Sequence, residues 1–201
     1  MLAWLEPQPG LMLCQHFQEV LEVTRGCPRV AVDMPIGLPE SGQIRQCDRL
    51  VRQRLGVRRA SLFPAPARSS LQCTDYDQVR GTGMSLQTFY LLPKIRQLDE
   101  ALCVADQQRV VECHPELLWT RRSGQPLALA KKSADGLELR RRLLPAPLPE
   151  VRWPRKLVQA DDVVDALGLA LAATDQLRGQ GWCFPERPQY DERGLRMEIW
   201  G

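Results

Sequence analysis

The chain has 201 residues, of which 44% are hydrophobic and 25% are charged, and this length and composition predict a globular protein with a substantial core. Its formal net charge of +3 is too small to indicate nucleic-acid binding by itself. The seven cysteines form no C-x-x-C pair, which argues against a structural zinc site. The sequence shows neither a signal-peptide pattern nor an apolar run long enough to cross a membrane, which argues against secretion and membrane insertion. We therefore expect a cytoplasmic protein.

The first part of the chain predicts two strands and a helix, and the second strand ends at Asp33. Residues 11–14 form a candidate strand, and apolar residues then recur at helical spacing from Phe17 until Gly26 ends the pattern. Residues 30–32 are apolar and run directly into Asp33, after which a proline and a glycine end regular structure. A short apolar run of this kind is typical of a buried parallel strand that delivers one side chain to the rim of a sheet.

Two helices flank a long irregular segment in the middle of the chain. Ser41 can cap a helix whose apolar residues recur up to Leu55. Residues 57–83 show no regular period, which predicts a long loop insertion with short helical pieces, and long ordered loops are often functional. A second helix is expected from Ser85, and Pro93 should kink or interrupt it.

Strands and helices alternate in the rest of the chain as well. The remaining expected elements are a short strand over 109–116, a charged helix over 131–144, an extended proline-rich connection over 145–154, a helix over 161–177 and an alternating edge strand over 196–200. This alternation predicts an α/β fold in which residues 1–201 form a single domain.

Acidic residues at two distant places are candidates for a metal site. Asp33 is either a ligand at the end of its strand or the residue that starts the following turn by accepting backbone N–H groups. Of Asp161 and Asp162, one suits capping of the helix that begins there, whereas Asp165 lies one turn further in among apolar residues, where an unpaired carboxylate is costly. Asp162 and Asp165 share a helix face, and we expect them to meet Asp33 in an acidic pocket suited to Mg²⁺ or Mn²⁺.

Glu112, His114 and Glu116 alternate in sequence and would point to one side of a strand, although Pro115 interferes with strand geometry there. The three residues are candidates for holding a metal, for general acid or base chemistry, or only for bonding backbone at a strand end. The chain has just two histidines, which excludes a zinc site built from several histidines.

Basic residues close to an acidic metal site would position phosphate groups. The candidates are Arg59 in the long loop beside Arg58, Lys94 after the helix proline, and the pair Lys131 and Lys132. Isolated basic pairs are more often solvated surface. The sequence has no P-loop, no G-x-G-x-x-G and no G-x-S-x-G motif, so it does not indicate nucleotide binding or hydrolysis through those devices.

The ordered motifs resemble domain-of-unknown-function family 429 (DUF429), whose members are described as predicted nucleases of ribonuclease H-like fold. The matching blocks are 32–39, 47–49, 58–66, 85–87, 93–95, 112–116, 131–132, 161–166 and 191–198. They cover most of the chain from about residue 10 onward, and their common order makes the match specific.

The resemblance implies a mixed sheet flanked by helices, with carboxylates on the first strand, the fourth strand and a late helix. Asp33 then takes the fourth-strand place and Asp162 or Asp165 the late-helix place, with Asp33, Glu112, Asp162 and Asp165 as candidate catalytic residues. Two metal ions, Mg²⁺ or Mn²⁺, would activate water and stabilise the leaving oxygen of a phosphodiester. The candidate substrate-binding residues are Arg59, Lys94, His114, Lys131 and Lys132.

One departure from the family pattern affects the expected activity. The usual opening strand, with its aspartate in a Val-Asp-Gly-Cys context, and the strand after it are not recognisable, so the chain resembles a domain that lacks its first two strands. A misplaced start codon, a truncation, a variant closure of the sheet or a homodimer that repairs the gap would each account for this. We expect unpaired backbone and apolar area beside the Asp33 strand, and weak or absent activity in this chain.

Three functions follow from these observations. The first is a metal-dependent nuclease that hydrolyses phosphodiesters, inactive or weak in this chain. The second is a non-catalytic module of the same fold that binds nucleic acid or protein. The third is phosphoryl transfer to a small molecule, which the absence of phosphate-binding glycine loops disfavours.

Overall fold

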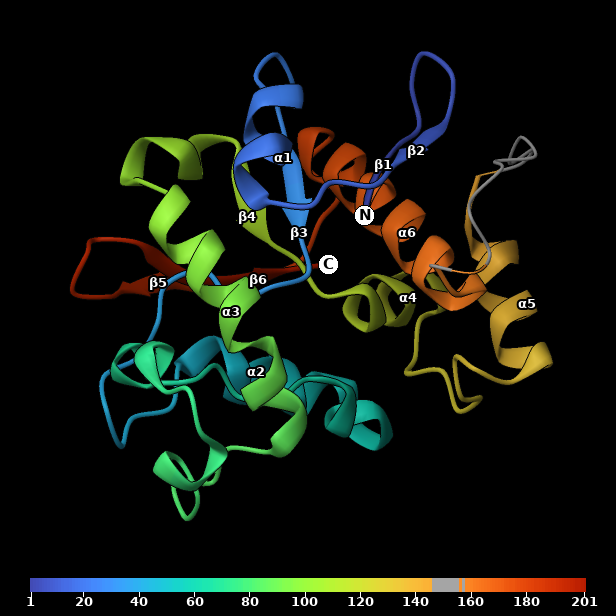
Figure 1. Ribbon diagram of the computed structural model, residues 1–201. Helices are drawn as coiled ribbons and strands as arrows, with labels where there is room; N and C mark the ends of the chain where they lie inside the picture. Colours follow the sequence, from blue (N-terminus) through green and yellow to red (C-terminus); the bar gives the residue numbers. More distant parts are fainter. Residues whose placement is uncertain (146–155, 157) are drawn as a thin grey trace.

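The computed structural model describes residues 1–145, 156 and 158–201 and shows a mixed α/β arrangement (Figure 1). Within this part of the chain the α-helices are α1 (Phe17–Val23), α2 (Gln46–Leu55), α3 (Leu86–Ala101), α4 (Pro115–Ser123), α5 (Ala134–Leu143) and α6 (Ala160–Leu177). The strands are β1 (Leu2–Trp4), β2 (Gly10–Met12), β3 (Val30–Val32), β4 (Val110–Glu112), β5 (Cys183–Tyr190) and β6 (Arg196–Trp200). The expected α/β class is therefore confirmed.

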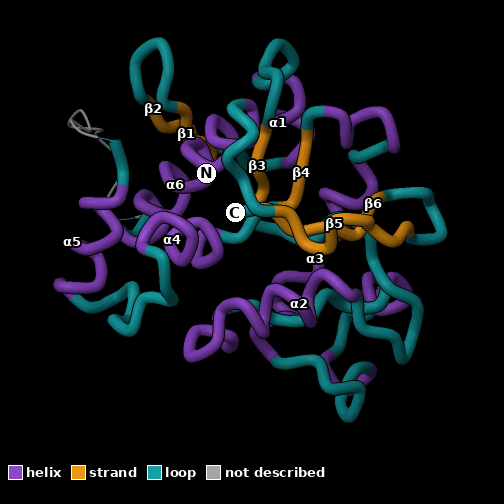
Figure 2. The backbone as a smooth tube through the Cα atoms, turned by 180° about the vertical axis from the view of Figure 1, so that it is seen from behind, coloured by secondary structure: helices purple, strands orange, loops and turns teal. Residues whose placement is uncertain are grey.

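The strands form three separate pairs, which Figure 2 shows from behind. β1 pairs with β2 and β5 with β6 in antiparallel fashion, whereas β3 and β4 are parallel. A parallel bridge between Cys113 and Trp200 joins the end of β4 to β6. The expected strand over 196–200 thus exists, but the expectation of an edge was wrong, because β6 lies between β5 and the end of β4 and its three central residues are buried.

Two strand edges face one another without a partner among the described residues. β3 pairs only with β4, and β1 pairs only with β2, while β1 and β3 both lie against α6 (Figure 1). On α6, Gly168 permits a close approach of α4, because an added Cβ would lie 2.5 Å from the Trp119 ring. The expectation of unpaired backbone beside the Asp33 strand is confirmed.

Several expected boundaries were close to the observed ones. The helix after residue 17, the strand before Asp33 and the late helix are confirmed, and residues 57–83 contain only the 3₁₀-helices η1 (Gly56–Ser61), η2 (Arg68–Gln72) and η3 (Tyr76–Gln78). The hairpin of β1 and β2 adds one strand to the single strand that was expected before α1. Another 3₁₀-helix, η4 (Val104–Gln108), precedes β4. The expected proline-rich connection lies almost entirely outside the described residues.

One expectation about the helices was wrong, and the interruption of a helix at Pro93, one of two outcomes expected there, does not occur. α2 begins at Gln46 with Arg45 at its N-cap, so Ser41 does not cap it. α3 continues through Pro93 without interruption, because Leu92 and Ile95 on either side of the proline are both buried in one core cluster and hold the helix in place. Ser85 caps α3, as expected, by accepting the backbone N–H of Thr88.

A buried arginine joins the elements that surround the end of β3. The Arg45 guanidinium is fully buried and donates to both carboxylate oxygens of Glu112, at 2.7 and 2.8 Å, and to both of Asp48, at 2.6 and 3.1 Å. It also donates to the carbonyl oxygens of Ile36 and Gly37 in the loop after β3. The Ile36 N–H in turn donates to Glu112 at 2.7 Å. These bonds fix the loop that follows Asp33 against β4 and α2.

We expect Glu112→Gln to lower the free energy of unfolding by about 3–5 kcal/mol, because the amide leaves a buried guanidinium without one of its two countercharges. Urea denaturation followed by circular dichroism measures this loss. The matched control is Glu138→Gln, which removes the charge of an exposed ion pair with Arg142 on α5 and should cost less than about 0.5 kcal/mol. Equal losses in the two variants would contradict a stabilising role for the buried network.

Candidate functional site

A cavity of about 920 Å³ opens at the carboxyl ends of the parallel strands β3 and β4. Asp33 and Pro35 follow β3, and Cys113 and His114 follow β4, so both strand ends contribute to its wall. Further residues come from η1, α3 and α6. Ligands of open α/β sheets generally bind in the crevice outside the carboxyl ends of the strands, so this cavity is the candidate functional site.

The acidic residues of α6 and a lysine before α5 form a charged group in this cavity. Lys131 Nζ lies 2.7 Å from Asp165 Oδ2 and 3.6 Å from Asp161 Oδ2. Trp119 Nε1 donates to the other oxygen of Asp165 at 3.5 Å. Burial raises the pKa of Asp165, whereas the charge and hydrogen bond of Lys131 oppose this shift. Lys131 is thus the cation that pairs with Asp165 in this cavity.

Asp33 is exposed to the cavity, and the charges of Asp165 and Lys131 act on its carboxylate as well. The surrounding protein raises its pKa, and the charge of Asp165 raises it further, whereas His114 and Lys131 lower it. Asp33, Asp162 and Asp165 all line this cavity, so the expectation that these distant residues lie close together is confirmed. Asp162 is exposed and accepts the Gln159 N–H at 3.3 Å, so it caps α6, as was expected for one residue of the cluster.

Glu112, His114 and Glu116 do not share one side of a strand. β4 ends at Glu112, and Pro115 is the first residue of α4, which places Glu116 in a helical turn. Proline is favoured at this position because its missing N–H has no partner in the helix anyway. All three residues still line the cavity, but both oxygens of Glu112 are occupied by Arg45, so Glu112 serves to position the strand end.

Two buried polar atoms beside the cavity have no hydrogen-bond partner among the described residues. His114 Nε2 lies 3.3 Å from the Ser61 carbonyl oxygen, which can only accept, so Nε2 carries a proton and Nδ1 is left without a partner. Glu116 Oε1 accepts from Arg140 at 2.5 Å, whereas its Oε2 is unpartnered. Buried atoms of this kind require an explanation, and a polar ligand in the cavity would supply one.

The expected basic residues divide into two groups. Lys94 and Lys131 line the cavity, whereas Arg59 and Lys132 are exposed and lie outside its lining. Arg58 takes the place that was expected for Arg59 and approaches Glu116 Oε1 at 3.4 Å. Sequence reasoning could not choose between adjacent arginines, because the choice depends on how the 3₁₀-helix η1 is turned toward the cavity.

The described residues do not contain a ready-made metal centre. No group of three or more His, Cys, Asp or Glu side chains in this part of the chain is arranged to hold a metal ion. Asp33 and Asp165 are the nearest to such a set, and Lys131 already pairs with Asp165. The donors present therefore do not fit a two-metal site, which needs several carboxylates around each ion.

The comparisons with known proteins identify the family of the chain but no activity. The sequence pattern of a family described as "Protein of unknown function (DUF429)" matches residues 2–190. Neither a curated protein nor a solved structure matches the chain with significance. None of the described helices combines the length and the apolar character that crossing a bilayer would require.

We expect Lys131→Met to destabilise the protein more at about pH 7.5 than at about pH 5. Removal of the ammonium raises the pKa of Asp165 further above its value in the unfolded chain, so the folded variant binds a proton that the unfolded chain has lost. The penalty for the buried charge is present above the folded pKa and disappears as the pH falls through it. Urea midpoints at the two pH values measure the difference.

Lys132→Met is the matched control, because Lys132 is adjacent, exposed and outside the cavity lining. Its loss of stability should be small and independent of pH. A pH-independent loss for Lys131→Met would show that Lys131 does not stabilise the ionised form of Asp165.

Proposed function

The chain belongs to the DUF429 family, and we propose that it is a ribonuclease H-like protein that binds the phosphodiester backbone of nucleic acid in the cavity beside Asp33, with weak or absent metal-dependent hydrolysis in residues 1–201. The observation that carries this proposal is the gathering of Arg58, Lys94 and Lys131 around one cavity at the carboxyl ends of β3 and β4.

The cations come from separate elements and can contact successive phosphates. Arg58 belongs to η1, Lys94 to α3, and Lys131 precedes α5. Lys94 is exposed, and no ion pair involves it within the described residues. Phosphate contacts from Lys and Arg supply the sequence-independent part of nucleic-acid affinity, and the modest net charge of +3 does not prevent this because the charges are local.

Two features support the ribonuclease H-like architecture. An antiparallel hairpin and a helix precede the parallel strands β3 and β4, and the long helix α6 packs against β1 and β3. Asp33 follows the first parallel strand and Asp165 lies on the late helix, which are the two places implied by the family resemblance. On this proposal the hairpin of β1 and β2 belongs to that architecture, so one of its strands is absent among the described residues, where two were expected to be missing.

The contacts of the cavity carboxylates are the reason why we propose weak or absent hydrolysis. In a two-metal mechanism, Asp33, Asp162 and Asp165 would hold Mg²⁺ or Mn²⁺, and the ions would activate water and stabilise the leaving oxygen. In the described residues Asp165 is paired with Lys131 and Asp162 caps α6, so a metal ion would have to compete with these two contacts. Asp33, Glu112, Glu116, Asp162 and Asp165 also line the cavity, so an anionic backbone would bind at its Lys94 side, where the cation forms no ion pair within the described residues.

We expect Lys94→Ala to weaken binding of a fluorescein-labelled single-stranded DNA or RNA of about 20 nucleotides by roughly threefold to tenfold at low salt. Removal of one phosphate contact should also lower the slope of log affinity against log salt by about 0.7 for a single strand. Fluorescence anisotropy at several salt concentrations measures both quantities.

Lys132→Ala removes the same charge from an exposed position outside the cavity lining and is the matched control. It should change the affinity by less than about twofold. The proposal is wrong if the unmodified protein binds neither oligonucleotide, or if the two variants weaken binding equally.

A titration with Mn²⁺ tests the limit on catalysis. We expect the melting temperature of residues 1–201 to rise by less than about 1 °C at millimolar Mn²⁺, because stabilisation requires a site that binds the ion in the folded state. A rise of several degrees that is lost in both Asp33→Asn and Asp165→Asn would overturn the binding-only interpretation and favour a metal-dependent hydrolase.

A further inference from the structure

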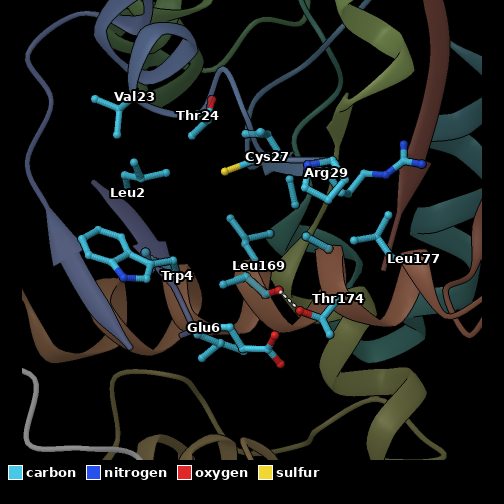
Figure 3. Close-up of a pocket in the computed structure, with 18 of the residues that line it drawn as sticks. Leu2, Trp4, Glu6, Val23, Thr24, Cys27, Arg29, Leu169, Thr174 and Leu177 are labelled. Carbon is cyan, nitrogen blue, oxygen red and sulfur yellow. Dashed lines mark hydrogen bonds between the residues drawn. The ribbon is translucent and has the colours of Figure 1, made fainter. Parts of the chain in front are cut away.

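The structure contains further pockets apart from the candidate site. One of about 430 Å³ lies between β1, β3 and α6, and Leu2, Trp4 and Leu169 line it (Figure 3). Another, of about 900 Å³, lies between the second half of α2, the end of α6 and the strands β5 and β6. The larger of these two pockets combines aromatic walls with polar atoms, which is the combination that orients a specific ligand.

The walls of this larger pocket, which we call the α2–β5 pocket, are mainly aromatic. They include Leu50 and Arg54 of α2, Gln176 of α6, Trp182 and Phe184 at the start of β5, and Trp200 of β6. The rings of Trp182 and Phe184 pack edge to face, with centroids 6.3 Å apart. The Arg54 guanidinium lies over the Trp182 ring, 4.1 Å from its centroid, and Arg54 is exposed. A planar guanidinium supported by an indole ring offers a surface on which a flat, electron-rich ring can stack.

Two buried polar atoms of residues that line this pocket have no hydrogen-bond partner among the described residues. One is Gln176 Oε1, which can only accept a hydrogen bond, and the other is Trp200 Nε1, which can only donate one. Gln176 is 9% exposed. The two side chains are neighbours, because a Cβ added at Gly181 would lie 2.8 Å from Gln176 Cγ and 3.4 Å from Trp200 Cε3. A ligand that satisfies both atoms must therefore present one donor and one acceptor close together.

We propose that the α2–β5 pocket binds a neutral, planar heteroaromatic ring with a lactam edge, the ring found in uracil and hypoxanthine nucleosides. The ring N–H of the lactam would donate to Gln176 Oε1, and its carbonyl would accept the Trp200 N–H, while the ring stacks on the Arg54 guanidinium. The volume of about 900 Å³ is sufficient for a nucleoside.

The pairing of one donor with one acceptor argues against other ligands. An apolar side chain or an acyl chain would leave both polar atoms unpaired, which costs free energy. An ionised carboxylate or a phosphodiester presents only acceptors and would leave Gln176 Oε1 without a donor. A sugar presents hydroxyl groups of both kinds, but it stacks through C–H groups of partial positive charge, which the Arg54 guanidinium repels.

Ligand binding in the α2–β5 pocket is independent of the proposed function. The pocket shares no lining residue with the cavity beside Asp33, and a nucleoside carries no phosphodiester that could contact Lys94. A nucleoside that fails to bind would therefore leave the proposed backbone binding intact, and an oligonucleotide that fails to bind would leave the α2–β5 pocket intact.

Titration of uridine and of N3-methyluridine into the full chain tests the proposal. The methyl group removes the ring N–H but keeps the ring, the carbonyl groups and the ribose. We expect uridine to shift the Trp200 indole N–H resonance saturably in heteronuclear NMR spectra, where the resonance is assigned by its absence in Trp200→Phe. N3-methyluridine should bind about tenfold more weakly, because one hydrogen bond to a buried acceptor is lost.

Two further sets of ligands define what the pocket recognises. Inosine and 1-methylinosine form a second matched pair, which shows whether the lactam is taken from a pyrimidine or from a purine. Free ribose, which lacks the base, should not shift the Trp200 resonance.

Two variants locate the binding site. Gln176→Leu removes the acceptor at similar side-chain size and should abolish the difference between uridine and N3-methyluridine, whereas Gln180→Leu, at an exposed position outside the pocket lining, should leave it unchanged. The matched nucleosides on the unmodified protein give an answer even if Gln176→Leu does not fold. The proposal is overturned by the absence of a saturable shift with both uridine and inosine, by equal binding within both pairs, by a shift with ribose equal to that with uridine, or by a preference that persists in Gln176→Leu.

Discussion

The arrangement of the site depends on the burial of one guanidinium group. Burial of the charged Arg45 side chain costs free energy because the guanidinium loses its contacts with water. Glu112, Asp48 and two loop carbonyls offset this cost by accepting its hydrogen bonds. These acceptors belong to β4, α2 and the loop after β3, so a chain that satisfies Arg45 must also bring those three elements together. Asp48 in addition accepts the Ala65 N–H at 3.0 Å, which attaches the long irregular loop to the same point. The elements around the cavity beside Asp33 are therefore held together by this charge network, of which Glu112 also lines the cavity.

Within the cavity, charge balance decides which ligands are compatible. Asp161 and Asp165 share Lys131, so the acidic residues of α6 are partly neutralised before any ligand arrives. A divalent ion would have to displace this ammonium and gain enough from two carboxylates to offset its own dehydration. A phosphate would also meet cations that are already paired, since Arg58 contacts Glu116 and Lys131 contacts two aspartates. Lys94, which forms no ion pair within the described residues, is the cation that is free to bind it.

The sequence predicted the residues whose roles follow from local pattern and missed those whose roles depend on distant contacts. Asp33 after an apolar strand and Asp165 within an apolar helix face could be found because each interrupts a clear period, and both line the cavity. Glu112 was taken for a candidate catalytic residue because nothing in the sequence pairs it with Arg45, which lies 67 positions away. Proline at position 115 did carry a signal for a helix start, and that signal separates His114 from the helical Glu116. β1 and β5 were missed because one is very short and the other contains two prolines and two charged residues.

β3 connects the Arg45 network to the cavity, because the strand ends in the carboxylate that enters the cavity. The strand is bonded to β4 along one edge, and the loop after Asp33 is bonded to Arg45 and Glu112. Asp33 therefore lies between two segments that are both held against β4, and its position follows from the same network that positions Glu112.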